Sequence, residues 1–128
     1  MPWRIHDILI LRLADMKRSI VEIGSLLRQK SCEDLGRQPA TRAAFERYLE
    51  ILSAASRHVP EHWHTEFGPE VPWRQLADLE KHIRRSYQRL DPAALWSVYA
   101  DELDPIERAV DAMLAPYASD HPPRLPHV

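Results

Sequence analysis

The sequence predicts an all-α protein that folds as an up-and-down bundle of four or five helices. Apolar residues recur at helical spacing along nearly the whole chain, and glycine occurs only 3 times in 128 residues. Proline and glycine punctuate the few places between the periodic segments. This length favours one domain, and a hydrophobic content of 45% is enough to build one core. We predict a helical domain over residues 1–115 and a proline-rich, disordered tail over residues 116–128.

The first predicted helix runs from about Arg4 to about Gln29. Its apolar residues follow a spacing of four and three, which makes a continuous stripe along one side: Leu9, Leu13, Met16, Ile20, Ile23 and Leu27. Additional apolar residues widen the stripe: Ile5, Ile8, Ile10, Leu11 and Val21. A helix with so wide an apolar surface is usually buried on more than one side. This favours a second subunit, although the central helix of a monomeric bundle has the same pattern.

The second predicted helix begins after a cap at Thr41 and ends near His58, where Val59-Pro60 disfavours helical geometry. Residues 31–40 contain Gly36 and Pro39 and are expected to be non-helical. The apolar stripe of this second helix comprises five residues: Phe45, Tyr48, Leu49, Leu52 and Ala55.

Residues 58–71 are predicted to form a loop that contains three histidines, with Glu61 and Glu66 nearby. These residue types bind metals, but their spacing matches no compact zinc pattern, so we interpret them as surface residues and predict no metal site. Arg57 and His62 are separated like the arginine and histidine of a nuclease signature, but they fall across a helix end. We interpret this spacing as coincidence. The histidines are His58, His62 and His64.

The third predicted helix has proline at each edge, from Pro72 to about Leu90. Its apolar stripe contains Trp73, Leu76, Leu79, Ile83, Tyr87 and Leu90. Its other side is basic and carries Arg74, Lys81, Arg84, Arg85 and Arg89. Asp91 and Pro92 are a cap and a first-turn proline for a fourth helix, which Pro105 should kink or split.

The bulk charge and the cysteine content limit the class of protein. A net charge of −2 argues against a generally basic nucleic-acid coat protein, although a local basic patch remains compatible with it. The single cysteine, Cys32, excludes an internal disulfide and favours a reducing compartment. The N-terminus lacks the apolar run of a signal peptide, and no stretch has the roughly 18 apolar residues that span a bilayer. We predict a cytoplasmic protein that contacts no membrane.

Four segments in this order resemble the HepT-like family of the HEPN superfamily. The segments are Arg4-Ile5-His6-Asp7-Ile8, residues 44–55, the pair Pro72-Trp73 after Pro60, and Asp91-Pro92 through Trp96. The resemblance covers residues 4–114. It implies a helical homodimer, a metal-independent endoribonuclease toxin without a cofactor, and an antitoxin partner of the MNT nucleotidyltransferase type. The family signature is an arginine, often followed by asparagine, then histidine five positions after the arginine and tyrosine two positions later.

Counted from Trp73, that signature falls on Glu80, Lys81, Arg85 and Tyr87, so only the tyrosine is retained. A guanidinium stays protonated, so Arg85 cannot replace the histidine as a proton donor or acceptor. Glu80 would repel the phosphate that the family's arginine stabilises. His82 is a candidate substitute base, but its side chain points about 60° away from that of Arg85 around the helix.

The altered helix leaves several interpretations open. Glu80 and Arg84 have the spacing of a helical surface ion pair. The basic residues Arg74, Lys81, Arg84, Arg85 and Arg89 fit contact with RNA backbone, contact with an acidic partner, or plain solvation. The resemblance implies that Tyr87 can be modified by the nucleotidyltransferase, whereas its place in the apolar stripe favours a core residue.

Three functions follow from these interpretations. The first is a HepT-like member of a toxin–antitoxin pair whose ribonuclease site has been lost or weakened. The second is an active metal-independent endoribonuclease toxin with a non-standard residue set. The third is a helical protein-interaction module with no role in RNA binding.

Overall fold

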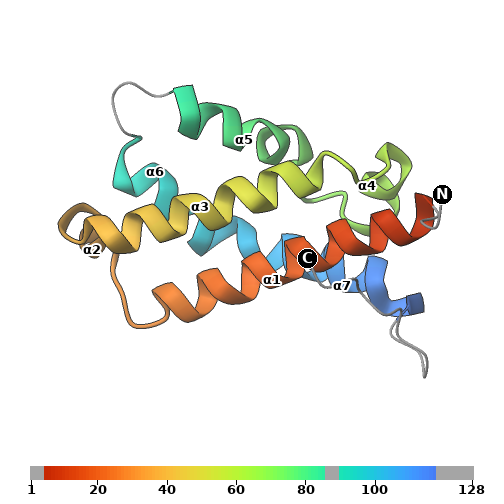
Figure 1. Cartoon of the computed structure of the whole chain (residues 1–128), viewed down its shortest axis with the longest axis horizontal. Coiled ribbons are helices and arrows are strands. Elements are labelled where there is room, and N and C mark those ends of the chain that lie inside the picture. The colour runs from red at the N-terminus through yellow and green to blue at the C-terminus, as the bar shows by residue number, and fades with distance from the viewer. Residues whose placement is uncertain (1–4, 86–89, 118–128) are drawn as a thin grey trace.

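The computed structural model describes residues 5–85 and 90–117, and these contain helices and no strand. The predicted all-α class is therefore confirmed. Four long rods dominate the fold (Figure 1). They are α1 (Ile5–Leu27), α3 (Pro39–Ser56), α5 (Trp73–Arg85) and a composite rod of α6 (Pro92–Ser97), the π-helical segment η1 (Val98–Glu102) and α7 (Leu103–Leu114).

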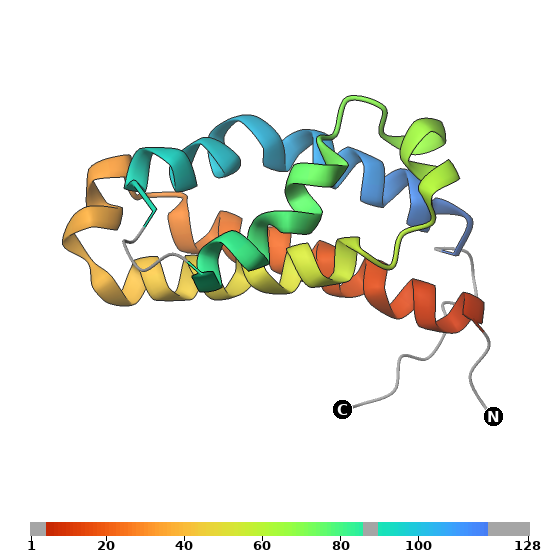
Figure 2. The ribbon, with the colours of Figure 1, turned by 90° about the horizontal axis from the view of Figure 1, so that it is seen from above.

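Helix α3 lies at the centre of the arrangement, because it packs along α1 on one side and beneath α5 on the other. The composite rod runs along α1, to which α7 packs, and it runs in the direction opposite to α5 (Figures 1 and 2). Helix α5 packs on α3, and a cavity lies between α5 and the α6–η1 segment. One face of α5 meets α3, and another faces α6 and η1.

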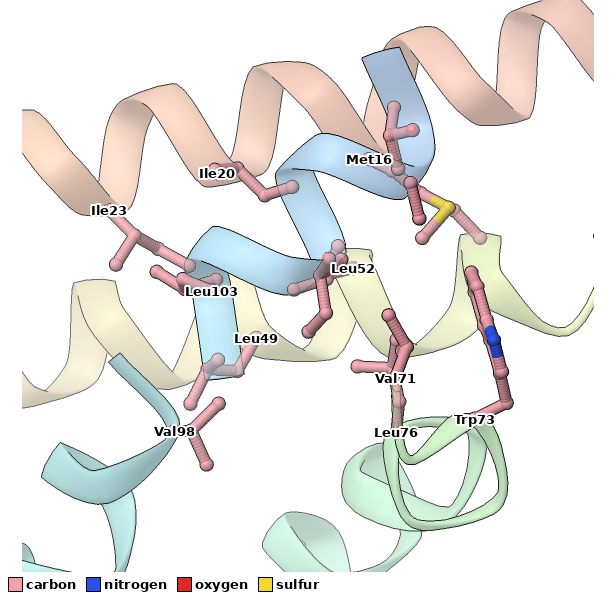
Figure 3. Packing of buried hydrophobic residues seen from close by; sticks show 14 of the residues in the cluster. Met16, Ile20, Ile23, Leu49, Leu52, Val71, Trp73, Leu76, Val98 and Leu103 are labelled. Atoms are coloured by element: carbon pink, nitrogen blue, oxygen red, sulfur yellow. The ribbon is translucent and has the colours of Figure 1, made fainter. Parts of the chain in front are cut away.

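The predicted apolar stripes form the core. Leu13, Met16, Ile20, Ile23 and Leu27 of α1 are buried, as the spacing predicts. They pack with residues from the other three rods, of which Figure 3 labels Leu49, Leu52, Trp73, Leu76, Val98 and Leu103. The same cluster includes Phe45, Leu95, Ile106, Val110 and Met113. Val21, which was assigned to the widened stripe, is instead 49% exposed. Tyr87 lies outside the described residues.

Two segments that were predicted to be non-helical contain short helices. The first is α2 (Cys32–Arg37), which is anchored by the buried Leu35 and begins where the Ser31 N–H donates to Asp34 Oδ2 at 2.8 Å. Helix α3 then begins at Pro39, before Thr41, so the predicted cap at Thr41 is wrong. A first-turn proline suits a helix start because its missing N–H would have no partner there. Thr41 instead donates its hydroxyl to Gln38 Oε1 at 3.0 Å.

The second unpredicted helix is α4 (Glu61–Phe67), inside the predicted loop. Trp73 fixes its position by stacking on His64, with 4.4 Å between ring centroids, and by donating its indole N–H to the Gly68 carbonyl at 2.8 Å. Gly68 leaves no room for a side chain, since an added Cβ would lie 2.7 Å from the Cβ of Ala109. The Trp73 contacts span five and nine residues and the Gly68 contact reaches α7, and none of them follows a periodic spacing that a sequence pattern would reveal.

Pro105 produces the predicted break in the last rod, but the break lies on its N-terminal side. A proline in a helix lacks an N–H and clashes with the carbonyl four residues earlier. Here the preceding turn widens into η1, in which the Leu103 N–H donates to the Val98 carbonyl. Pro105 then fits into the first turn of α7. The predicted cap at Asp91 is confirmed, because its side chain accepts from the Ala93 N–H at 3.1 Å.

The C-terminal end of the described chain is a short 3-10 helix, η2 (Ala115–Tyr117). It crosses the predicted boundary between the domain and the tail at residue 115. The rest of the predicted tail lies outside the described residues, and the disorder predicted for it stays a prediction.

Candidate functional site: the two faces of helix α5

Glu80 is buried on the side of α5 that faces α3. The whole residue is 9% exposed, and two arginines bind its carboxylate. Arg57 Nη2 lies 2.8 Å from Oε2, and Arg84 Nη1 lies 3.1 Å from Oε1. The predicted pairing of Glu80 with Arg84 is confirmed, but the interpretation of Glu80 as a surface residue is wrong.

Further contacts hold this carboxylate in place. Arg84 Nε also lies 3.3 Å from Glu50 Oε2, which makes a chain of four alternating charges that we call the Glu80 network: Arg57, Glu80, Arg84 and Glu50. Ser53, buried on α3, accepts the backbone N–H of Glu80 at 3.0 Å and donates to the Ala77 carbonyl at 3.1 Å. The network therefore joins α5 to α3 by both side-chain and backbone contacts.

The Glu80 network opens onto a small charged groove of about 170 Å³ between α1, α3 and α5. Its charged lining contains both signs in equal number, with Arg12, Asp15, Arg47, Glu50, Glu80 and Arg84. An RNA phosphate in this groove would meet carboxylates as well as guanidiniums. Both guanidiniums nearest to Glu80 are already bound to it.

The predicted basic face is divided by these contacts. Arg84 is bound to Glu80 and Glu50 and is not free for RNA or for a partner. Lys81 and Arg85 are exposed, and neither makes a side-chain ion pair within the described part of the chain. Arg74 is exposed near the other end of α5, and Arg89 lies outside the described residues. Among the described residues of this face, Lys81 and Arg85 are therefore neighbouring cations without an ion pair, and Arg74 is a third at the other end of α5.

His82, the candidate substitute base, belongs to a different face of α5 from Glu80. Two positions along a helix turn the side chain by about 200°. His82 lines a larger cavity of about 480 Å³ between α5 and the α6–η1 segment. Glu80 does not line that cavity, and His82 does not line the groove at Glu80. The two side chains are not brought together into one site.

The histidines of residues 58–64 form no metal centre. No group of three or more histidine, cysteine, aspartate or glutamate residues in the described part of the chain is arranged to hold a metal ion. His64 is instead a packing residue stacked on Trp73, and burial lowers its pKa, with Glu61 opposing the shift. His62 is exposed and meets the edge of Trp63.

Arg57 is a residue of the Glu80 network that the sequence pattern does not identify. Its spacing to His62 is a coincidence by our interpretation of the sequence, and in the structure Arg57 binds Glu80, 23 residues away, and donates to the Ala77 carbonyl at 2.9 Å. Ser53 and Glu50 were likewise not singled out. No short-range spacing points to these contacts, because they form only when α3 and α5 pack together.

Comparison with known proteins identifies the family. The family model described as "Ribonuclease HepT-like" matches residues 16–113, which is most of the chain. The chain belongs to the HepT-like family. The matched range extends from the middle of α1 almost to the end of α7 and includes the Glu80 network. The family match therefore covers the helices that form the core.

Three relatives of this HepT-like chain carry names that refer to ribonucleases. A Thermococcus cleftensis protein named "Probable ribonuclease HepT" is 29% identical over 91 residues, 71% of this chain and 82% of the relative. A "Putative RNase" of Caldanaerobacter subterraneus is 26% identical over 66% of this chain and 74% of its own length. Another "Putative RNase", from Methanocaldococcus jannaschii, is 30% identical over 55% of this chain and 63% of its own length. No solved structure matches the chain. No helix among the described residues is long and apolar enough to cross a membrane.

Proposed function

We propose that this HepT-like chain does not cleave RNA and acts as the binding component of a toxin–antitoxin-type pair. In this proposal it is a homodimer whose partner is a nucleotidyltransferase of the MNT type. One observation carries the proposal: Arg57 and Arg84 bind the carboxylate of Glu80, the residue to which we assign the signature's arginine position by counting from Trp73.

The electrostatics at Glu80 oppose phosphoryl chemistry. Ribonucleases of this kind need positive groups aimed at the negative charge that develops on the phosphate. The carboxylate supplies the opposite sign, and it also holds the side chains of Arg57 and Arg84. Releasing either arginine toward a phosphate would break a contact of 2.8 or 3.1 Å and leave the buried carboxylate short of a partner.

The proposal also implies that the chain lacks a side chain placed to transfer a proton during RNA cleavage. Arg85 replaces the histidine of the signature, and it is permanently protonated. His82 lines the cavity on the α6–η1 side, away from Glu80, so it is not placed to restore the pair. Loss of a general acid or base alone typically lowers the rate by about 10²–10⁴-fold.

The exposed cations Lys81 and Arg85 support a binding role. Both are unpaired in the described part of the chain, so their charges are available to an acidic partner surface. Tyr87, the signature's tyrosine, lies outside the described residues, and its modification by the partner stays a prediction. Co-expression and co-purification with an MNT-type nucleotidyltransferase test the partner. Lys81→Glu/Arg85→Glu should weaken the complex, whereas the exposed Arg18→Glu should not.

The decisive experiment is an RNA-cleavage assay of the purified chain in a metal chelator, with end-labelled single-stranded RNA. We expect no cleavage by the wild type. Chelator-resistant cleavage that disappears in His82→Ala would overturn the proposal and establish the chain as an active ribonuclease.

A restored variant sharpens this assay. Glu80→Arg/Lys81→Asn/Arg85→His rebuilds the family signature, but it places a third guanidinium beside Arg57 and Arg84. The structure therefore calls for a fourth change, Arg57→Gln, which removes one of the two. Cleavage by the quadruple variant beside an inactive wild type would show that the fold keeps the frame of the site and that the residue changes removed its chemistry.

A further inference from the structure

A second groove lies between the C-terminal part of α1 and the η1–α7 part of the composite rod, and we call it the α1–η1 groove. Its volume is about 350 Å³, and it shares no lining residue with the groove at Glu80 or with the cavity beside His82. Val21, Gly24 and Arg28 line it from α1, and Tyr99, Leu103 and Asp104 line it from the composite rod.

Val21 gives the groove an exposed apolar edge. Its exposed fraction is 49%, and it is the one large hydrophobic side chain that is exposed among the residues that the structure describes. A single exposed valine on a flat surface would need no explanation. Val21 instead borders a groove whose opposite wall contains the buried Leu103, so a ligand in the groove can remove apolar surface from water.

Gly24, which is three positions after Val21 and on the same side of α1, is not required by the packing of this chain. A Cβ added to Gly24 would meet nothing within 4 Å, and its backbone is not left-handed. Gly68 differs, since a Cβ there would lie 2.7 Å from the Cβ of Ala109. Glycine within a helix is less stable than alanine, and it permits another backbone to approach closely. The open space at Gly24 therefore suits a helix that packs against α1 from outside.

Two charged side chains of the groove lack partners of opposite sign. Arg28 and Asp104 are exposed, and neither makes an ion pair within residues 5–85 and 90–117. Glu107, which also lines the groove, is different because Lys17 Nζ lies 3.0 Å from its carboxylate. Arg28 and Asp104 therefore offer one positive and one negative charge to a ligand.

The packing of the two rods places these charges at opposite ends of the groove. Helix α1 and the composite rod run in opposite directions (Figure 1), and Lys17 sets their register by its contact of 2.8 Å with Asp111. A step forward along α1 from Lys17 is thus a step back along the composite rod. Asp104 lies toward the Val21 end, and Arg28 lies at the other end. Val21 and Arg28 are seven positions apart, which is about 10 Å along the helix axis.

We propose that the α1–η1 groove binds an amphipathic α-helix of a partner protein, which carries a basic residue for Asp104, apolar residues over Val21 and Gly24, and an acidic residue for Arg28. Seven positions separate the two charged residues of the bound helix, because this spacing matches the length of the groove. Its apolar residues lie three and four positions from the charged ones, on the same side of the helix. The opposite charges at the two ends fix the direction in which the helix binds.

The groove favours a helix of another protein over a second copy of this chain. A groove between two helices accepts a third helix, whose apolar side chains enter at one-turn intervals. A second copy would need an exposed apolar anchor, and the one that the described residues offer, Val21, lines the groove itself. The inference goes beyond the proposed function, because Lys81 and Arg85 are on α5, which does not line this groove.

The test uses a phage-displayed library of randomised helical peptides, selected on the full chain. We expect the selected peptides to share a basic and an acidic residue seven positions apart with apolar residues between them. A synthetic copy of the most enriched peptide should shift backbone amide signals of α1, η1 and α7. Selected peptides without this pattern, or shifts confined to other helices, would overturn the proposal.

Gly24→Leu tests the location of the site. The leucine side chain occupies the space of the bound helix and should weaken binding of the selected peptide by about tenfold or more. Leucine favours a helix more than glycine does, so the Tm should not fall, and this separates loss of the site from loss of the fold. Ala93→Leu, at an exposed position of α6 outside the groove, should leave the affinity unchanged. Unchanged affinity in Gly24→Leu would refute the assignment.

A charge exchange tests the recognition chemistry. Arg28→Glu/Asp104→Lys should weaken binding of the selected peptide by about tenfold or more, and a peptide with its two charged residues exchanged should restore it. The control is Arg18→Glu, at an exposed position of α1 that does not line the groove. Equal binding of both peptides to the exchanged variant would show that Arg28 and Asp104 do not select the ligand.

Sedimentation of the wild type and Gly24→Leu over a range of concentrations distinguishes the occupants. A homodimer that Gly24→Leu leaves intact agrees with a partner helix in the groove. A homodimer that Gly24→Leu dissociates would show that a second copy covers the groove, which would overturn this inference. The RNA-cleavage assay and the Lys81→Glu/Arg85→Glu experiment can fail independently of these measurements, because they concern α5.

Discussion

Helix α5 carries charges on two faces that are used in opposite ways. Toward α3, Glu80 and Arg84 are paired with Arg57 and Glu50 into one network. Toward α6 and η1, Arg74, Asp78 and His82 face a cavity and have no partners among the described residues. The difference shows that residue type along one helix does not decide whether a charge stabilises the fold or remains available for binding. The facing helix decides it.

The largest expected change in stability comes from reversing the charge of Glu80. Glu80→Lys places a third cation between Arg57 and Arg84 and should lower the free energy of unfolding by about 2 kcal/mol. Breaking a fully buried pair costs about 3–5 kcal/mol, but Arg57 and Arg84 are 44% and 62% exposed, so solvent reduces the penalty. Urea unfolding of the variant and the wild type measures this loss in the free energy of unfolding.

The matched control for that reversal is Asp78→Lys, the same chemical change two positions earlier on α5. Asp78 has no partner to lose, so the free energy of unfolding should change by no more than about 0.5 kcal/mol. Similar losses in both variants would show that the two faces do not differ as described.

A double-mutant cycle of Arg57→Ala and Glu80→Ala isolates the contact between α3 and α5. We expect a coupling free energy of about 1 kcal/mol, above the value for an exposed pair because Glu80 is buried but limited by the exposure of Arg57. A cycle of Arg57→Ala with Arg85→Ala serves as the reference and should give no coupling. Additive effects of Arg57→Ala and Glu80→Ala would mean that the ion pair does not contribute to stability.

The smallest expected effect concerns Glu102 and pH. Burial raises the pKa of Glu102 above its ordinary value of 4.5, and the neighbouring Asp101 adds to the shift. A carboxyl whose pKa is raised in the folded state favours folding when protonated, and this contribution is lost as pH rises through the folded-state pKa. Glu102→Gln should therefore be more stable than the wild type at pH 7, by about 0.3 kcal/mol because the group is partly solvated.

The difference between Glu102→Gln and the wild type should close as the pH falls below about 4.5, where the carboxyl is protonated in both the folded and the unfolded states. Chemical unfolding at several pH values measures it, with the exposed Glu70→Gln as the control for loss of one charge. A wild type that is more stable than Glu102→Gln at neutral pH would indicate an ionised Glu102 with a favourable partner.

Prediction from sequence succeeded where the cause is local. The 3.6-residue period identifies the core residues of α1, and the proline at position 92 together with Asp91 marks the start of α6, because spacing and capping depend on neighbours a few residues away. Prediction failed for α2 and α4. Six- and seven-residue helices have too few turns to show a period, and contacts such as the stacking of His64 on Trp73 hold α4 in place.

The candidate site shows the same difference between features with a local cause and features that depend on packing. The sequence by itself determined that Glu80 can pair with Arg84 one turn away, and the placement of Glu80 and Arg85 at the signature's arginine and histidine positions is a prediction from the resemblance. Only the tertiary structure decided that Arg57 binds Glu80, and that Arg74, Asp78 and His82 share a cavity with Glu102. The physical reason is that an ion pair or a cavity between helices depends on how their surfaces pack, and residues 23 positions apart carry no local signal of that contact.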